Sequence, residues 1–213
     1  MIRILLLAGI FLWSMQLLAQ KYKPFSGRFR YEVSFVDSLR GPQPLTSYMT
    51  VFTNDTLVRV ESETVQLGKQ IMIRHLILKK YYLLLEIDGQ KFAIQHLDES
   101  DSSKQASYQF KKRWGSKQFA GQKAKKMEVT RSSGGSTQTV YYLKKISPKY
   151  TGAISGIPGL PVSYQIQTEN GLYTYKLLEW EEKAMDKDLF GIPSDYKRVS
   201  FEQFIEAVSG NQN

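Results

Sequence analysis

The sequence predicts a mainly β protein: a single curved antiparallel sheet, or half-barrel, of about nine or ten strands, with a short C-terminal helix. Two observations support this fold class. Over much of the chain, apolar and polar residues alternate with a period of two, which is the spacing of a strand with one buried face. Turn residues also recur at short intervals, and no long segment has the apolar spacing of an extended helix.

The first expected strand shows this alternation most clearly. Phe29, Tyr31, Val33 and Phe35 alternate with charged and small polar residues, so one face of this strand should be buried. The other strands that we expect cover residues 48–52, 57–63, 70–78, 81–87, 91–97, 119–131, 137–145, 162–168 and 172–179.

Two dipeptides predict tight hairpins between these strands. Asp88-Gly89 and Asn170-Gly171 each lie between two strand-like runs, and such residues tolerate the positive φ angles of a two-residue turn. The run 81–85 is apolar without alternation, so we place it centrally in the sheet with both faces covered. Residues 152–161 are rich in Gly and Pro and are expected to lie outside the sheet.

A short helix is expected near the C-terminus. Ser200 is a suitable N-cap, and the helix should extend to about Val208 with an apolar face formed by Phe201, Phe204, Ile205 and Val208. No linker divides the chain, so residues 20–213 are predicted to form one domain.

The first residues have the pattern of an export signal. Arg3 precedes an apolar run over 4–12, and the small residue Ala19 predicts cleavage after a signal peptide of residues 1–19. The run is short for a membrane span, which leaves a retained anchor as the weaker alternative. Because Gln20 stands where a lipoprotein carries cysteine, we expect a periplasmic protein with neither lipid anchor nor transmembrane span. An extracellular location is the other option.

The composition excludes several classes of protein. The chain has 213 residues, 42% of them hydrophobic and 13% aromatic, and no cysteine. It is long enough for one substantial core, whereas disulfide scaffolds, cysteine-based zinc sites, iron–sulfur clusters and thiol catalysis are excluded. His75 and His96 lack a metal-binding spacing, and the clustered carboxylates lie in polar turns. We therefore predict no catalytic residue, no metal and no cofactor, and an enzyme is the least supported function.

The positive charge is concentrated in one stretch. The chain carries 29 basic and 20 acidic residues, but residues 102–127 hold eight basic residues and no acidic one. Aromatic residues lie among these cations, an arrangement that suits anionic partners; a solvated strand face is the alternative. The candidate contacts to an anionic partner are Lys111, Lys112, Arg113, Lys123, Lys125 and Lys126.

Two motifs carry a family resemblance. One is GIPGLPV over 156–162, and the other is LFGIPSDYKRV over 189–199. With Phe25-Ser26-Gly27 and the segment 119–126, they resemble the exported bacterial family named domain of unknown function 4412, and the first motif is similar to the GLPGLI family of Bacteroidetes. The resemblance implies a relation to periplasmic lipoprotein carriers of the LolA and LolB type, in which an incomplete barrel encloses an apolar cavity.

The first expected function is a carrier of a lipid, an acyl chain or another apolar molecule inside the half-barrel. Its candidate cavity residues are Phe29, Tyr31, Val33, Phe35, Tyr48 and Phe52. Gly156, Pro158, Gly159 and Pro161 are candidates for a lid over the barrel mouth, with a rigid connection between strands as the alternative. The second expected function is an adaptor or scaffold that binds an envelope protein or an anionic envelope polymer through residues 102–127. Nucleic acid is not expected as a partner.

Overall fold

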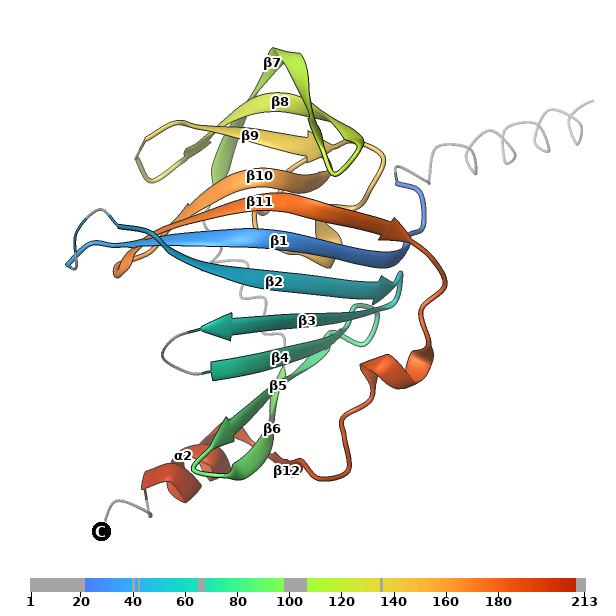
Figure 1. The fold of residues 1–213 in the computed structure, drawn as a ribbon, viewed down its shortest axis with the longest axis vertical. Helices are drawn as coiled ribbons and strands as arrows, with labels where there is room; N and C mark the ends of the chain where they lie inside the picture. Colours follow the sequence, from blue (N-terminus) through green and yellow to red (C-terminus); the bar gives the residue numbers. More distant parts are fainter. Residues whose placement is uncertain are drawn as a thin grey trace, which may run out of the picture.

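The computed structural model describes residues 22–39, 41, 43–64, 68–97, 107–134 and 136–209, so the predicted signal peptide lies outside it. In this part of the chain, twelve strands form one sheet in the order β12-β6-β5-β4-β3-β2-β1-β11-β10-β9-β8-β7, drawn in Figure 1. The strands are β1 (Ser26–Asp37), β2 (Leu45–Asn54), β3 (Leu57–Thr64), β4 (Gly68–His75), β5 (Lys80–Ile87), β6 (Gln90–Leu97), β7 (Tyr108–Phe119), β8 (Gln122–Arg131), β9 (Gln138–Leu143), β10 (Leu160–Gln167), β11 (Gly171–Glu182) and β12 (Lys197–Val199).

The mainly β class and the single curved sheet are confirmed, but the predicted strand number of nine or ten is wrong. One missed strand is β7, in which nearly every side chain is exposed, so no apolar alternation marks it in the sequence. The second is β12, which has only three residues and pairs in parallel with β6. The turn between β7 and β8 has positive φ angles at Ala120 (47°) and Gly121 (75°). It lacks the Asn or Asp from which such a turn is predicted.

The hairpin predicted at Asp88-Gly89 is confirmed, with φ angles of 51° and 73° between β5 and β6. The hairpin of β10 and β11 is also present, but not with the predicted turn. Gly171 is already the first residue of β11, the Thr168 amide donates a hydrogen bond to its carbonyl, and Asn170 has no positive φ, so the prediction of a two-residue turn at Asn170-Gly171 is wrong. Strand β5 is covered on both faces as predicted, since Leu84 packs in a cluster with Ile71 while Leu85 packs in another with Phe92. This double coverage explains why the run 81–85 does not alternate.

Helix α2 (Phe201–Ser209) confirms the predicted C-terminal helix. The Ser200 hydroxyl accepts a hydrogen bond from the Gln203 amide at 3.2 Å, and the Gln203 side chain accepts one from the Ser200 amide at 2.9 Å. This reciprocal pair is a capping box. Phe204 packs on the Phe92 ring of β6, but Phe201 and Ile205, predicted for the same face, are about half exposed. The buried stripe of the helix is therefore narrower than predicted.

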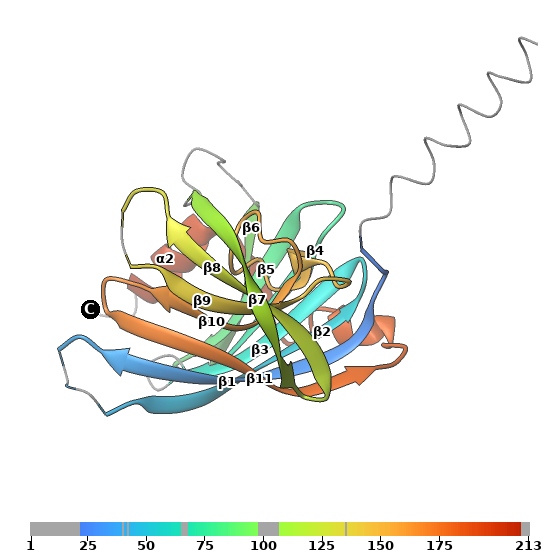
Figure 2. The ribbon, with the colours of Figure 1, turned by 90° about the horizontal axis from the view of Figure 1, so that it is seen from above.

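The main core lies on the inner face of the sheet, which is the face that carries Phe29 and its partner Val51. No α-helix covers this part of the face in the described chain; the connection between β9 and β10 does. That connection, residues 144–159, contains η1 (Pro148–Tyr150) and buries Tyr150, Ile154 and Ile157. The sheet curves around it, as Figure 2 shows. We call it the core segment.

The expectation that residues 152–161 lie outside the sheet is wrong at its end. Strand β10 begins at Leu160, and Pro161 pairs with Tyr142 of β9. The register shifts between Pro161 and Ser163, and an irregularity of this kind accommodates a residue that has no amide hydrogen to donate.

The chain between β11 and β12 covers the part of the outer face formed by β3, β4, β5 and β6. It contains η2 (Lys187–Phe190), and Ile192 and Tyr196 pack against the buried outer cluster of β4, β5 and β6. Arg59 of β3 donates a hydrogen bond to the Leu189 carbonyl at 3.2 Å and pairs with Glu61 at 2.7 Å. The segment thus spans the sheet on its way to β12 at the edge (Figure 1).

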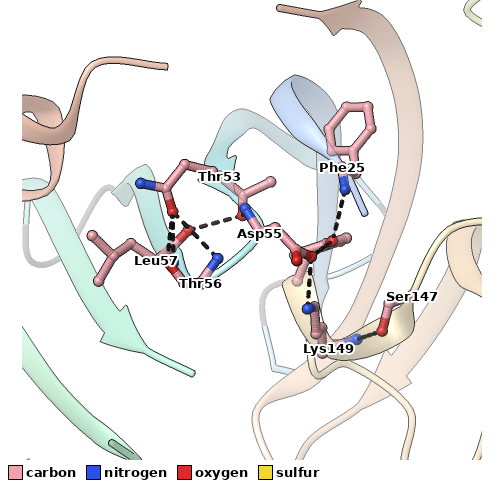
Figure 3. Close-up of polar contacts among 9 residues, drawn as sticks. Phe25, Thr53, Asp55, Thr56, Leu57, Ser147 and Lys149 are labelled. Carbon is pink, nitrogen blue, oxygen red and sulfur yellow. Dashed lines mark hydrogen bonds and ion pairs between the residues drawn. The ribbon is translucent and has the colours of Figure 1, made fainter. Parts of the chain in front are cut away.

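A polar anchor attaches the core segment to the turn between β2 and β3 (Figure 3). The Tyr150 hydroxyl donates a hydrogen bond to Asp55 and accepts one from the Phe25 amide, while the Lys149 ammonium pairs with Asp55 at 2.7 Å. Arg74 of β4 donates a hydrogen bond to the Tyr150 carbonyl at 2.6 Å. We call these contacts the Asp55 anchor.

The anchor perturbs both of its titratable oxygens. Partial burial alone would raise the pKa of Asp55, but the hydrogen bonds from Lys149 and Tyr150 and the charge of Lys149 outweigh it and lower the pKa. Burial, followed by the bond to Asp55, raises the pKa of the Tyr150 hydroxyl. At neutral pH the carboxylate is therefore ionised and the phenol protonated, which is the pairing that the hydrogen bond requires.

We predict that Tyr150→Phe lowers the free energy of unfolding by about 1–3 kcal/mol, because the Asp55 carboxylate and the buried Phe25 amide each lose a partner. Urea denaturation measures this difference. Tyr82→Phe is the control, since the Tyr82 hydroxyl makes an exposed hydrogen bond of 3.4 Å to Gln95; its effect should stay within about 0.5 kcal/mol. Equal losses in the two variants would show that the anchor has no special role.

Candidate functional site

A basic groove lies across the end of the sheet formed by β7, β8 and β9. Its volume is about 560 Å³. The residues that line it are Lys112, Arg113, Trp114, Gly115, Ser116, Lys123, Lys125, Lys126, Tyr142 and Lys144. We call this feature the basic groove.

An irregularity in β7 shapes the groove. Lys112 pairs with Met127 and Ser116 pairs with Lys125, so three residues of β7 lie opposite the single residue Lys126. Such an insertion bends a strand and redirects its side chains. Here the bend includes Gly115, whose φ is 111°, and the neighbouring Trp114 side chain is fully exposed.

Most of the positive charge that gathers in the groove has no carboxylate partner among the described residues. Within the described residues, the groove lysines form no ion pair. They are Lys112, Lys123, Lys125, Lys126 and Lys144. Only the groove's arginine is paired, since Arg113 contacts Glu128 at 2.7 Å.

Elsewhere on the described surface, many cations have partners. Lys23 pairs with Glu182 at 2.7 Å, Arg30 pairs with Glu179 at 2.9 Å, and Lys91 pairs with Asp195 at 2.8 Å. Other described cations, among them Lys80, Lys176 and Lys197, also form no ion pair, so the groove is distinguished by bringing five unpaired lysines together. A concave surface lined by one sign of charge concentrates counter-ions.

The charge also acts on Glu128 beside the groove. The hydrogen bond from Arg113 lowers the pKa of this carboxyl, and the charges of Arg113, Lys111 and Lys126 lower it further. In turn the bond to Glu128 raises the pKa of Arg113. An anion near these side chains is stabilised by the same field.

The structure brings together most of the residues predicted to contact an anion. Lys112, Arg113, Lys123, Lys125 and Lys126 all line the groove, whereas Lys111 does not. Lys111 instead lies opposite Glu128 in the register of β7 and β8.

Sequence reasoning assigned no role in the groove to Trp114 and did not identify Lys144. Lys144 follows β9, outside the basic stretch, and reaches the groove because β9 pairs with β8 through Tyr142 and Lys125. The register of the predicted hairpin 119–131/137–145 is the signal from which it could have been found. The position of Trp114 in the groove depends on the irregularity in β7, which no sequence pattern predicts.

The six candidate cavity residues divide between the two faces of the sheet. Phe29, Tyr31 and Val33 lie on the inner face and are buried in the main core. There Tyr31 also donates a hydrogen bond to the Pro161 carbonyl at 2.9 Å. Phe35, on the same face, is half-buried.

Tyr48 and Phe52 lie on the outer face instead. In the register of β1 and β2, Tyr48 is opposite Glu32 and Phe52 is opposite Arg28, so both point away from the main core. The Arg30 guanidinium lies over the Tyr48 ring at 4.2 Å from its centre.

The candidate lid residues belong to the core segment and to the start of β10. Gly159 is tightly packed, because a Cβ there would lie 2.3 Å from the Leu143 carbonyl oxygen. Gly156 lines an open hollow of about 350 Å³, together with Tyr108, Pro148, Lys149, Gly152, Ala153, Ile154 and Ser155. Pro158, Gly159 and Pro161 do not line that hollow.

The described residues contain no group of three or more His, Cys, Asp or Glu side chains that could hold a metal ion. His75 accepts a hydrogen bond from the Leu78 amide at 3.2 Å, and the side chain of His96 lies outside the described set. None of the helices in the described chain is both long and apolar enough to cross a bilayer.

Comparisons with known proteins place the fold but name no family. No family model and no curated protein matches the chain, so the resemblance to domain of unknown function 4412 stays an expectation. Among solved structures, the chain is similar to PNGF-II, crystallised in space group C2, with a TM-score of 0.50 and 12% identity. The match covers 86% of this chain but only 33% of PNGF-II.

Two further solved structures are similar over most of their length. One is a LolA superfamily protein from Nitrosomonas europaea, with a TM-score of 0.40, 8% identity and coverage of 81% of this chain and 93% of that one. The other is a DUF1329 family protein from Desulfovibrio piger, with a TM-score of 0.39, 11% identity and coverage of 86% and 94%. The chain itself forms one curved, mainly β sheet, and the solved structures to which it is similar include a LolA superfamily member.

We predict that replacing both Lys123 and Lys125 by Gln raises the melting temperature by about 1–2 °C at low salt, because it relieves repulsion between unpaired like charges. The difference should vanish at 1 M salt, where such interactions are screened. Replacing the paired lysines Lys23 and Lys91 by Gln is the control and should not raise it. A lower melting temperature in the groove variant would contradict this reading of the charges.

Proposed function

We propose that this protein binds a multivalent anion in the basic groove and acts as an adaptor or scaffold for an anionic partner. One observation carries the proposal: five lysines from neighbouring strands line one hollow and form no ion pair within the described chain. A bound anion would supply the missing counter-charge. Such binding should weaken with ionic strength, because mobile ions compete for the same lysines.

The main alternative is that the lysines only protect a sheet edge. Strand β7 lies at the edge of the sheet, and lysines on an edge strand discourage pairing with other chains. That explanation fits Lys111, Lys112 and Lys117. It does not cover Lys123 and Lys125, because β8 is paired on both sides. Edge protection therefore accounts for only part of the charge.

The proposed location is the periplasm, which rests on the predicted signal peptide. In that compartment, the partner would be an anionic polymer of the envelope or an envelope protein with an acidic surface. No cofactor or catalytic group is part of the proposal.

The test measures binding of inorganic polyphosphate by titration calorimetry at 50 mM and 200 mM salt. Replacing Lys112, Lys123, Lys125 and Lys126 by Gln should weaken binding about 30-fold, since four lost charge contacts contribute about 0.5 kcal/mol each. The affinity of the unmodified protein should fall as salt rises.

The matched control carries the same change in net charge. It replaces Lys23, Lys69, Lys91 and Lys183 by Gln, four exposed lysines that already have carboxylate partners. This variant should keep most of its affinity. If it loses as much as the groove variant, binding depends on net charge alone and the groove is not the site.

A second candidate function, binding of an apolar molecule, is favoured by one observation on the inner face. At the margin of the buried core, the rings of Phe35 and Tyr173 stack at 4.4 Å, and the ring of Tyr175 stacks at 4.7 Å on that of Tyr164, which is itself buried in the core. Phe35, Tyr173 and Tyr175 are only partly buried, so this aromatic row offers apolar surface at the end of the inner face.

Native mass spectrometry of the purified protein tests this candidate. We expect an added acyl species on the unmodified chain, and its loss in Phe35→Arg, because the arginine puts a charge on the aromatic row. Detection of the polypeptide mass alone under gentle ionisation would count against an apolar ligand.

A further inference from the structure

Trp114 is the feature of the basic groove that charge alone does not explain. Its side chain is fully exposed, although exposing a large aromatic surface to water is unfavourable. Polyanion binding through lysines needs no aromatic ring. The exposed indole therefore points to a property of the ligand other than its charge.

Trp114 lies in the irregularity of β7, between Arg113 and Gly115. Next to it, Gly115 has a φ of 111°, and a Cβ built on Gly115 would meet nothing within 4 Å. The glycine is thus required by its backbone conformation and not by lack of space. On the other side, Arg113 is tied to Glu128 at 2.7 Å. The irregularity thus fixes the position from which the indole reaches the groove.

The surroundings of Trp114 limit what it can stack on. The indole face is electron-rich and attracts positively polarised groups, but the groove lysines would repel a cationic ligand. Tyr142, the other aromatic residue that lines the groove, is buried at 4% exposure. The groove therefore offers one free ring, surrounded by positive charges.

A single free ring fits some anionic ligands better than others. Proteins that hold single-stranded nucleic acid stack successive bases on several aromatic side chains. Binding to a lipid surface uses a wider apolar face, which the charged lining does not provide. A sugar ring, by contrast, presents one face of polarised C–H groups to one indole, while its anionic substituents extend sideways toward cations.

We propose that the basic groove binds an anionic saccharide, with Trp114 stacked on one sugar ring and Lys112, Lys123 and Lys125 contacting its sulfate, phosphate or carboxylate groups. This inference rests on the proposed function and adds the chemical class of the ligand. The groove volume of about 560 Å³ lies within the usual range of ligand sites.

The test compares a ring-bearing and a ring-free polyanion. The probes are a heparin-derived hexasaccharide and inorganic polyphosphate, each titrated into the unmodified protein and into Trp114→Ala. We expect the variant to bind the hexasaccharide about five- to tenfold more weakly, the loss of one ring stack, and to bind polyphosphate within about twofold. Trp114→Phe should recover part of the lost affinity.

Phe201→Ala is the matched control, because Phe201 is an exposed aromatic residue on α2, a different part of the fold. It should bind both probes as the unmodified protein does. Melting curves should show that all variants are folded, because the side chains of Trp114 and Phe201 are exposed.

Three results would overturn the saccharide inference. Trp114→Ala could leave hexasaccharide binding unchanged, or oligodeoxythymidine could bind more tightly and depend more on Trp114. Vesicles containing phosphatidylglycerol could also shift the tryptophan emission to the blue in the unmodified protein but not in Trp114→Ala. Each of these leaves the anion site itself in place. If replacing the groove lysines by Gln changes the affinity for neither hexasaccharide nor polyphosphate, the proposed function fails instead. The two failures are therefore distinguishable.

Discussion

The Asp55 anchor is the contact on which the closure of the core depends. The inner face of the sheet carries a large aromatic surface, and in the described chain the core segment rather than a helix covers it. An irregular segment on an apolar face needs partners for its polar groups. Asp55, Phe25 and Arg74 supply them to Lys149 and Tyr150. With those partners in place, Ile154 and Ile157 pack into the core.

Features set by neighbouring residues were predictable from the sequence. Asp88-Gly89 predicts its hairpin because the turn itself demands positive φ angles, and Ser200 predicts the start of α2 through a local cap. The course of residues 152–159 was not predictable. Their Gly and Pro content indicates a departure from regular structure, but their packing onto the inner face follows the preceding Tyr150, which is bound to Asp55 and Arg74, far away in the sequence.

The candidate site was predictable in its charge but not in its shape. The density of basic residues in 102–127 predicts five of the groove residues. Lys144 and Trp114 needed the strand register, since β9 brings the first and the irregularity in β7 exposes the second. Strand β7 was missed for the same reason that it matters: side chains exposed along nearly its whole length leave no hydrophobic pattern.

Because β7 is so exposed, most of its side chains can be substituted with little effect on stability. Ten of its twelve residues are exposed, so substitutions there do little to the core, and stability places few limits on them. The strand is also held by one neighbour only, because it ends the sheet. Relatives with the same sheet can therefore diverge in this strand and acquire different binding preferences while keeping one fold. Such divergence resembles the variation of binding loops on rigid scaffolds, but it takes place here in a regular strand.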